Sequence, residues 1–122
     1  MHEAFRKAVE ARDLDAARAA LSPGIVLQNP GTSGPITGID AVVETLAMID
    51  QVLPDLRYLD EYHAQDGSAA VHFEGHVGDQ RVEGVDLLWF DDQGLIREFT
   101  VLLRPVEALM AIGRAVAAKR SA

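Results

Sequence analysis

The sequence contains no cysteine in 122 residues. This excludes disulfides, thiol nucleophiles and thiolate metal ligands, and a reducing compartment is the plain expectation. No segment approaches the roughly 20 consecutive apolar residues of a membrane-spanning helix, and residues 1–7 lack the apolar run of a signal peptide. We therefore expect a cytoplasmic protein without a membrane partner.

Positive charge is also scarce. The 11 Lys and Arg residues stand against 19 Asp and Glu residues, which gives a formal net charge of −8 at pH 7. This balance disfavours nucleic-acid backbones and anionic membranes as partners. The remaining composition, 48% hydrophobic and 25% charged, is typical of a globular protein. The length predicts one domain over residues 1–122, long enough for a hydrophobic core.

The most regular pattern is a series of β-strands in the second half. Turn-forming residues separate four predicted strands, at residues 57–65, 69–77, 80–91 and 95–104. Residues 91–94 close the last hairpin, because Gly94 can adopt the positive φ that such a turn needs. A two-residue turn at residues 78–79 would place Phe73 opposite Gly84 in the preceding hairpin.

The other segments follow helical periodicity. Residues 2–21 predict two helices, the second N-capped by Asp13. A short strand at residues 25–29 precedes a loop and then a helix that begins at a capping box, residues 37–40, and stops before Pro54. A last helix begins at Pro105. Helices segregated from antiparallel strands predict an α+β fold, with helices covering one face of a curved antiparallel sheet.

This order of elements resembles the nuclear-transport-factor-2-like superfamily. Residues 84–96, GVDLLWFDDQGLI, with Arg104-Pro105 after the last strand, are most similar to SnoaL-like proteins. The resemblance implies a cone-shaped α+β fold that binds a small hydrophobic molecule, a cofactor-free isomerase or polyketide-cyclase-like activity without metal, and a homodimer. It is specific for the fold and not for one reaction.

Matched to the ketosteroid isomerases of this superfamily, Asp86 falls on an aspartate that stays protonated and donates a hydrogen bond to the substrate oxyanion, a behaviour known for that family. The general-base aspartate of those enzymes falls on Asn29, and a carboxamide cannot shuttle a proton at neutral pH. Their helix tyrosines fall on Phe5 and Leu46. The acid/base aspartate of SnoaL-like cyclases falls on Val101.

A lesser alternative is an epoxide hydrolase. Residues 27–29, Leu-Gln-Asn, resemble the Tyr-x-Asn of epoxide hydrolases with this fold, with the tyrosine lost. Their Arg-x-Asp signature and last-strand aspartate are absent as well. The chain thus departs from each of these active sites.

The residues themselves also single out Asp86. Period-two alternation places it on one strand face with Gly84 and Leu88, and a buried carboxylate is costly unless it is hydrogen-bonded, ion-paired or protonated. We hypothesise that Asp86 lies at a pocket floor with a raised pKa and acts as proton donor or general base. The alternative is a carboxylate satisfied by Arg97, Arg104 or backbone amides.

Two further polar positions are candidates. Asn29 either follows the strand alternation into the interior or caps the turn at residues 30–31. His72, Glu74 and His76 alternate on one strand, and the predicted register places them on the face opposite Asp86. A register slip of one residue would bring His72 beside Asp86 as an acid/base pair, and a metal site formed by the three is the weakest alternative.

The predicted pocket is apolar apart from Asp86 and Asn29. Its expected lining is Phe5, Val9, Leu27, Leu46, Ile49, Val71, Phe73, Leu88, Phe99, Val101 and Leu103. Such a pocket suits a small hydrophobic molecule with a carbonyl, hydroxyl or epoxide group. The alternatives to an enzyme are a non-catalytic binding protein and an accessory module with a filled cavity. The opposite sheet face, with Val85, Leu87 and Trp89, is the expected homodimer interface.

Overall fold

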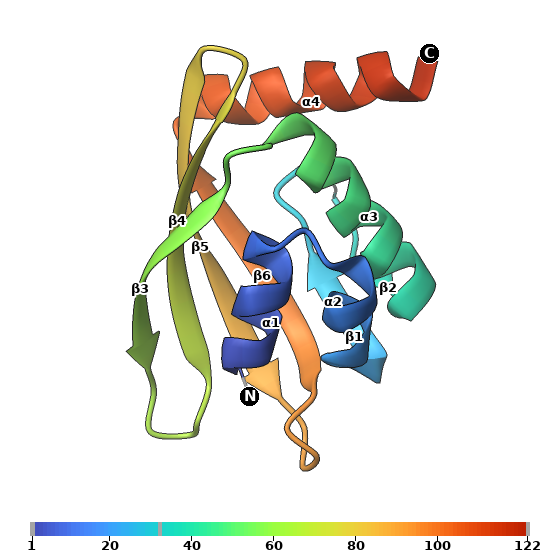
Figure 1. Ribbon diagram of the computed structural model, residues 1–122, viewed down its shortest axis with the longest axis vertical. Helices are drawn as coiled ribbons and strands as arrows, with labels where there is room; N and C mark the ends of the chain where they lie inside the picture. Colours follow the sequence, from blue (N-terminus) through green and yellow to red (C-terminus); the bar gives the residue numbers. More distant parts are fainter. Residues whose placement is uncertain (1, 32, 122) are drawn as a thin grey trace.

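The computed structural model, which describes residues 2–31 and 33–121, is a curved sheet with helices on its concave side (Figure 1). The chain runs in the order α1 (His2–Glu10), α2 (Leu14–Ala19), β1 (Leu21–Gln28), β2 (Ile36–Thr37), α3 (Ile39–Val52), β3 (Arg57–His63), β4 (Ala69–Val77), β5 (Gln80–Phe90), β6 (Ile96–Arg104) and α4 (Val106–Ser121). The predicted α+β fold is confirmed.

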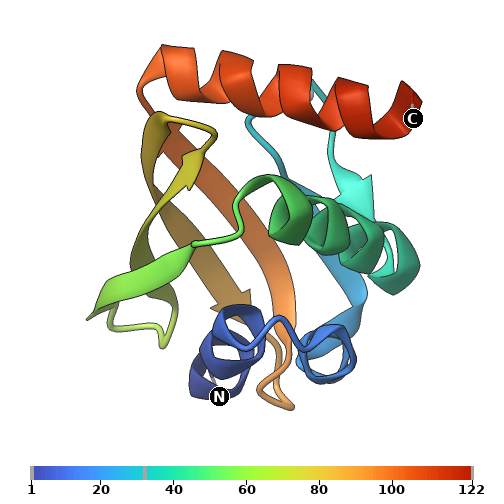
Figure 2. The same ribbon diagram turned by 45° about the horizontal axis from the view of Figure 1, so that its top comes forward.

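The sheet has six strands in the order β2-β1-β6-β5-β4-β3. Neighbouring strands are antiparallel except β1 and β6, which are parallel. Helices α1, α2 and α3 cover the concave face, and α4 crosses one end of the molecule above α3 (Figure 2).

The register of the central hairpin is the predicted one. Val77 pairs with Gln80 across a turn in which Gly78 has a φ of 57°, so Phe73 lies opposite Gly84 and Val71 opposite Asp86. The hairpin from β5 to β6 also closes as predicted, because Gly94 has a φ of 79° and the Asp91 carboxylate accepts hydrogen bonds from the backbone of the turn.

Two local predictions were wrong, and one short strand was missed. The second helix ends at Ala19 and β1 begins at Leu21, because this residue pairs with Ile96 of β6, a partner that local periodicity cannot reveal. The capping box at residues 37–40 is absent: Gly38 is the N-cap of α3 and makes no side-chain capping bond. The two-residue strand β2 was not predicted either.

Arg12 fixes the segment that joins α3 to β3. It adopts a left-handed backbone with a φ of 59°. Its guanidinium donates to the carbonyl oxygens of Leu53, Pro54 and Leu56. These carbonyls follow the C-terminus of α3, where backbone acceptors lack helical partners. The clamp therefore holds Leu53 and Leu56 against the interior of the molecule.

Among the described residues, no helix combines the length and the apolar character needed to cross a membrane. The cytoplasmic location stays a prediction.

Candidate functional site

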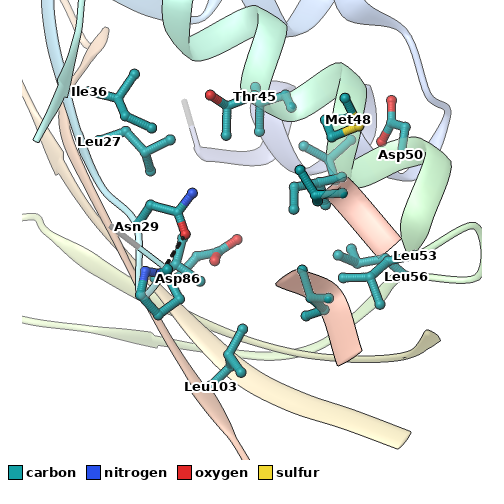
Figure 3. A pocket seen from close by; sticks show the side chains of 18 of the residues that line it. Leu27, Asn29, Ile36, Thr45, Met48, Asp50, Leu53, Leu56, Asp86 and Leu103 are labelled. Carbon is teal, nitrogen blue, oxygen red and sulfur yellow. Dashed lines mark hydrogen bonds between the residues drawn. The ribbon is translucent and has the colours of Figure 1, made fainter. Parts of the chain in front are cut away.

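A cavity of about 830 Å³ lies between the sheet and the helices. This volume is within the range of small-molecule binding sites, which are mostly apolar with a few placed polar groups. Figure 3 shows Asn29 and Asp86 on the sheet side of the cavity, with Thr45 and Met48 of α3 facing them. The cavity is open, unlike the filled interior expected of an accessory module.

Most of the predicted lining residues border this cavity, namely Val9, Leu27, Leu46, Ile49, Phe73, Phe99, Val101 and Leu103. Three predicted lining residues, Phe5, Val71 and Leu88, instead lie in the core, each with at most 2% of its surface exposed. Phe5 packs edge-on against Phe99, with ring centroids 5.3 Å apart. Strand alternation identifies the interior face, but not how far along each strand the helices pack directly on it.

Asp86 lies at the floor of the cavity and is 5% exposed. Its Oδ2 accepts a hydrogen bond of 2.7 Å from the Tyr58 hydroxyl. Burial raises the pKa of Asp86 from its ordinary value of 3.8 to about 7, and the hydrogen bond from Tyr58 opposes this rise. The neutral and ionised forms of Asp86 are therefore both populated near pH 7.

The alternative that an arginine satisfies Asp86 is wrong. Arg97 is exposed, and Arg104 donates to Glu83 at 3.1 Å. Instead, the Tyr58 hydroxyl donates a hydrogen bond to Oδ2 of Asp86. Among the described residues, every buried side-chain oxygen or nitrogen atom has a hydrogen-bond partner. Asp86 also lines the cavity, so its carboxyl group borders the cavity space.

Tyr58 is the functional candidate that sequence analysis missed. Counted from the turn after β3, Leu59 would pair with Phe73 and Tyr58 would point outward. A bulge between Tyr58 and Glu61 inserts one residue, so Tyr58 pairs with Phe73 and faces the cavity. A bulge of this kind has no reliable sequence signal. Burial, followed by the nearby Asp86, raises the pKa of the Tyr58 hydroxyl well above its ordinary value of 10.0.

Helix α1 holds the backbone of Tyr58 at the sheet edge. The Glu10 carboxylate accepts from the Tyr58 N–H at 3.0 Å, and the Arg6 guanidinium donates to the Tyr58 carbonyl oxygen at 3.4 Å. Arg6 also pairs with Glu61 at 2.7 Å, on the far side of the bulge. These contacts fix the part of β3 from which the tyrosine reaches Asp86.

Asn29 satisfies both interpretations of its role. Its Oδ1 accepts a hydrogen bond of 3.1 Å from the backbone of Gly31, which is the predicted turn cap. The same residue lines the cavity on the side of Asp86 (Figure 3). Its carboxamide is thus held in place at the cavity wall by the turn that follows β1.

His72 does not meet Asp86. It pairs with Val85, and its Nε2 lies 2.9 Å from Oε2 of Glu83 on the outer face of the sheet. The acid/base pair that a register slip would create is therefore wrong, and the outer-face interpretation is confirmed. Among the described residues, no group of three His, Cys, Asp or Glu side chains could hold a metal ion. Glu74 pairs with Arg57 instead of with a histidine.

Residues 2–99 match the family model of the SnoaL-like domain. The chain belongs to the SnoaL-like family. A comparison of this SnoaL-like chain with curated proteins finds no match.

Solved structures show the same fold. A protein with a cystatin-like fold from Silicibacter pomeroyi DSS-3 is 27% identical, with a TM-score of 0.90 over 97% of this chain and 83% of the other. A steroid delta-isomerase from Pseudomonas aeruginosa is 29% identical, with a TM-score of 0.89 over 96% of this chain and 86% of the other. A SnoaL-like protein from Burkholderia thailandensis E264 shares the fold at 20% identity, with a TM-score of 0.71 over 85% of this chain and 92% of the other.

Proposed function

We propose that this SnoaL-like protein binds a small, largely apolar molecule that carries a carbonyl or a related oxygen, and that it acts on this molecule as a cofactor-free isomerase- or cyclase-type enzyme. The observation that carries the proposal is a buried carboxyl group, Asp86, with a pKa of about 7 at the floor of an apolar cavity of about 830 Å³. A general acid or base works best when its pKa is near the working pH.

The two protonation states of Asp86 have different uses. The neutral carboxyl group donates a hydrogen bond to a ligand oxygen. In a ketone with a C=C bond between its β and γ carbons, the carboxylate takes a proton from the α carbon, and the electron pair of the broken C–H bond moves toward the carbonyl oxygen to give a dienolate. The same carboxyl group then returns the proton at the γ carbon, so that the carbonyl group re-forms and the C=C bond moves to the α and β carbons. The Tyr58 hydroxyl keeps its hydrogen bond to Oδ2 of Asp86 throughout, which leaves Oδ1 for the ligand. The Asn29 carboxamide orients the ligand.

The similarity to a steroid delta-isomerase at 29% identity supports an isomerase reaction on a polycyclic ketone. One observation favours a second candidate, a non-catalytic binding protein. Asn29 occupies the position at which the resemblance to ketosteroid isomerases implies a general base, and it is engaged in capping a turn. In this alternative the cavity and Asp86 bind the ligand without proton transfer.

The test uses ligand binding and turnover of wild type and Asp86→Asn. Steroid and polycyclic ketones, terpenoid epoxides and small phenols are screened by thermal shift, because a ligand at 100 times its Kd stabilises the folded state by about 2.7 kcal/mol. The enzyme predicts that Asp86→Asn abolishes turnover of a bound ketone and changes its Kd by less than about tenfold, or 1.4 kcal/mol. Binding without turnover by wild type would favour the binding protein, and no binding by any class would contradict both.

The SnoaL-like chain is also proposed to form a homodimer through the outer sheet face. Leu102 is 54% exposed and Tyr62 61% exposed there, beside the partly exposed Val85, Leu87 and Trp89. Charges of both signs, Glu83 and Arg104 among them, border this apolar area, so a two-fold axis could pair it with itself. The molar mass from light scattering at micromolar concentration tests the proposal, and a monomer would contradict it.

A further inference from the structure

Gly84 is the residue over which the ring of Phe73 lies. The two residues pair directly across β4 and β5. A Cβ atom at Gly84 would meet the Leu102 carbonyl oxygen of β6, and it would also be 2.5 Å from Cζ and 2.8 Å from Cε2 of Phe73, far inside van der Waals contact. Phe73 therefore leans across β5 with the far end of its ring above the glycine. This is a close approach that no other residue type at position 84 would permit.

Tyr58 lies on the other side of the same ring. It pairs with Phe73 from β3, and the two rings are edge to face, with centroids 6.5 Å apart and an interplanar angle of 83°. Its hydroxyl passes beyond Phe73 to reach Asp86, which lies two residues along β5 from Gly84 on the same face. A Phe73 ring that stood higher above the sheet would occupy the space through which the phenol passes.

We propose that Gly84 is a positioning residue: it lets Phe73 lie low across β5, and this keeps open both the path from Tyr58 to Asp86 and the cavity floor beside the carboxyl group. The inference deepens the proposed function, because it concerns the same site. The hydrogen bond that it explains exists without a ligand, so the inference can be tested on the free protein.

The test is the titration of Asp86 in Gly84→Ala, followed by carboxyl ¹³C NMR. In the wild type the hydrogen bond from Tyr58 lowers the pKa of Asp86. A raised Phe73 ring would break this hydrogen bond. We expect the pKa of Asp86 to rise by about one unit, and the same rise is expected in Tyr58→Phe. The matched control is Gly24→Ala, where an added Cβ meets no atom within 4 Å, and its Asp86 should titrate as in the wild type.

A second variant is needed to separate the contact of Gly84 with Phe73 from its contact with Leu102. The added Cβ would also meet the Leu102 carbonyl oxygen of β6, and this clash alone could unfold Gly84→Ala. In the double variant Gly84→Ala/Phe73→Leu the side chain at position 73 no longer reaches position 84. The contact with Leu102 remains in the double variant. We therefore expect Gly84→Ala to lower the free energy of unfolding less in the Phe73→Leu background than in the wild type, and the double variant to show the Asp86 pKa of Phe73→Leu alone.

Two results would overturn the inference. One is an Asp86 pKa in folded Gly84→Ala equal to that of the wild type. The other is a loss of unfolding free energy from Gly84→Ala that is equal in the Phe73→Leu background and in the wild type, because the glycine would then be required by the backbone of β6 and not by the ring. The ligand screen with Asp86→Asn is independent, so loss of the proposed function would leave this titration result standing, and the reverse holds as well.

Discussion

The two faces of strand β5 shift the pKa of a carboxyl group in opposite directions. On the inner face Asp86 is surrounded by apolar residues and has a raised pKa, and within residues 2–31 and 33–121 its partner is a tyrosine and not a cation. On the outer face the Glu83 carboxylate accepts hydrogen bonds from His72 and Arg104. The hydrogen bond from His72 lowers the pKa of Glu83 most, and that from Arg104 lowers it further. Water and countercharges keep the outer carboxylate ionised, whereas their absence makes the inner one a titrating group near neutral pH.

The largest expected difference between the faces is in the pH dependence of stability. For Asp86 the folded-state pKa of about 7 lies above the ordinary value of 3.8, so its favourable contribution is complete below about pH 4 and is lost as the pH rises through 7. Between pH 5.5 and pH 8.5, the free energy of unfolding of wild type should fall by about 2 kcal/mol more than that of Asp86→Asn. Urea denaturation at the two pH values measures this difference.

The matched control for this prediction lies on the other face. Glu83 has a lowered pKa, so its contribution is present above its ordinary value of 4.5 and is lost as the pH falls below it. Glu83→Gln should therefore keep the wild-type slope between pH 5.5 and pH 8.5. Equal slopes for wild type and Asp86→Asn would show that burial of Asp86 does not raise its pKa.

The next largest effect concerns the apolar part of the outer face. Leu102 pairs with Val85 and is 54% exposed, so Leu102→Glu adds a charge to the proposed interface without disturbing the core. We expect the dissociation constant of the dimer to rise by at least about tenfold, or 1.4 kcal/mol, as measured by analytical ultracentrifugation. The same substitution at Met110 of α4, also exposed at 57%, is the control. If both variants weakened the dimer equally, the effect of Leu102→Glu would not identify the outer sheet face as the interface.

The smallest effect is expected from Tyr58→Phe. This substitution removes the hydroxyl and keeps the ring against Phe73. It should lower the free energy of unfolding by about 1 kcal/mol, the net value of a typical hydrogen bond, and raise the pKa of Asp86 further above 7. Carboxyl NMR and denaturation measure the two quantities. An unchanged Asp86 pKa would mean that the tyrosine does not bind the carboxyl group in solution.

Much of this molecule could be predicted from local chemistry. The turns at Gly78 and Gly94 set the register, and strand alternation then places Asp86 on the inner face. The rest depends on partners distant in sequence. β1 begins early because Leu21 pairs with Ile96, and Tyr58 enters the site because of a bulge on β3. The helix tyrosines of ketosteroid isomerases fall on Phe5 and Leu46 in this chain, and α1 instead holds the backbone of a tyrosine on a strand.

The contacts of α1 with Tyr58 have another consequence. β3 is an edge strand, and an edge with unpaired N–H and C=O groups can template the addition of a further strand from another molecule. At Tyr58 both backbone groups are already occupied, by Glu10 and Arg6. The helix that holds the tyrosine in place therefore also blocks strand addition at this point of the edge, and a substitution that detaches α1 from Tyr58 would remove both effects.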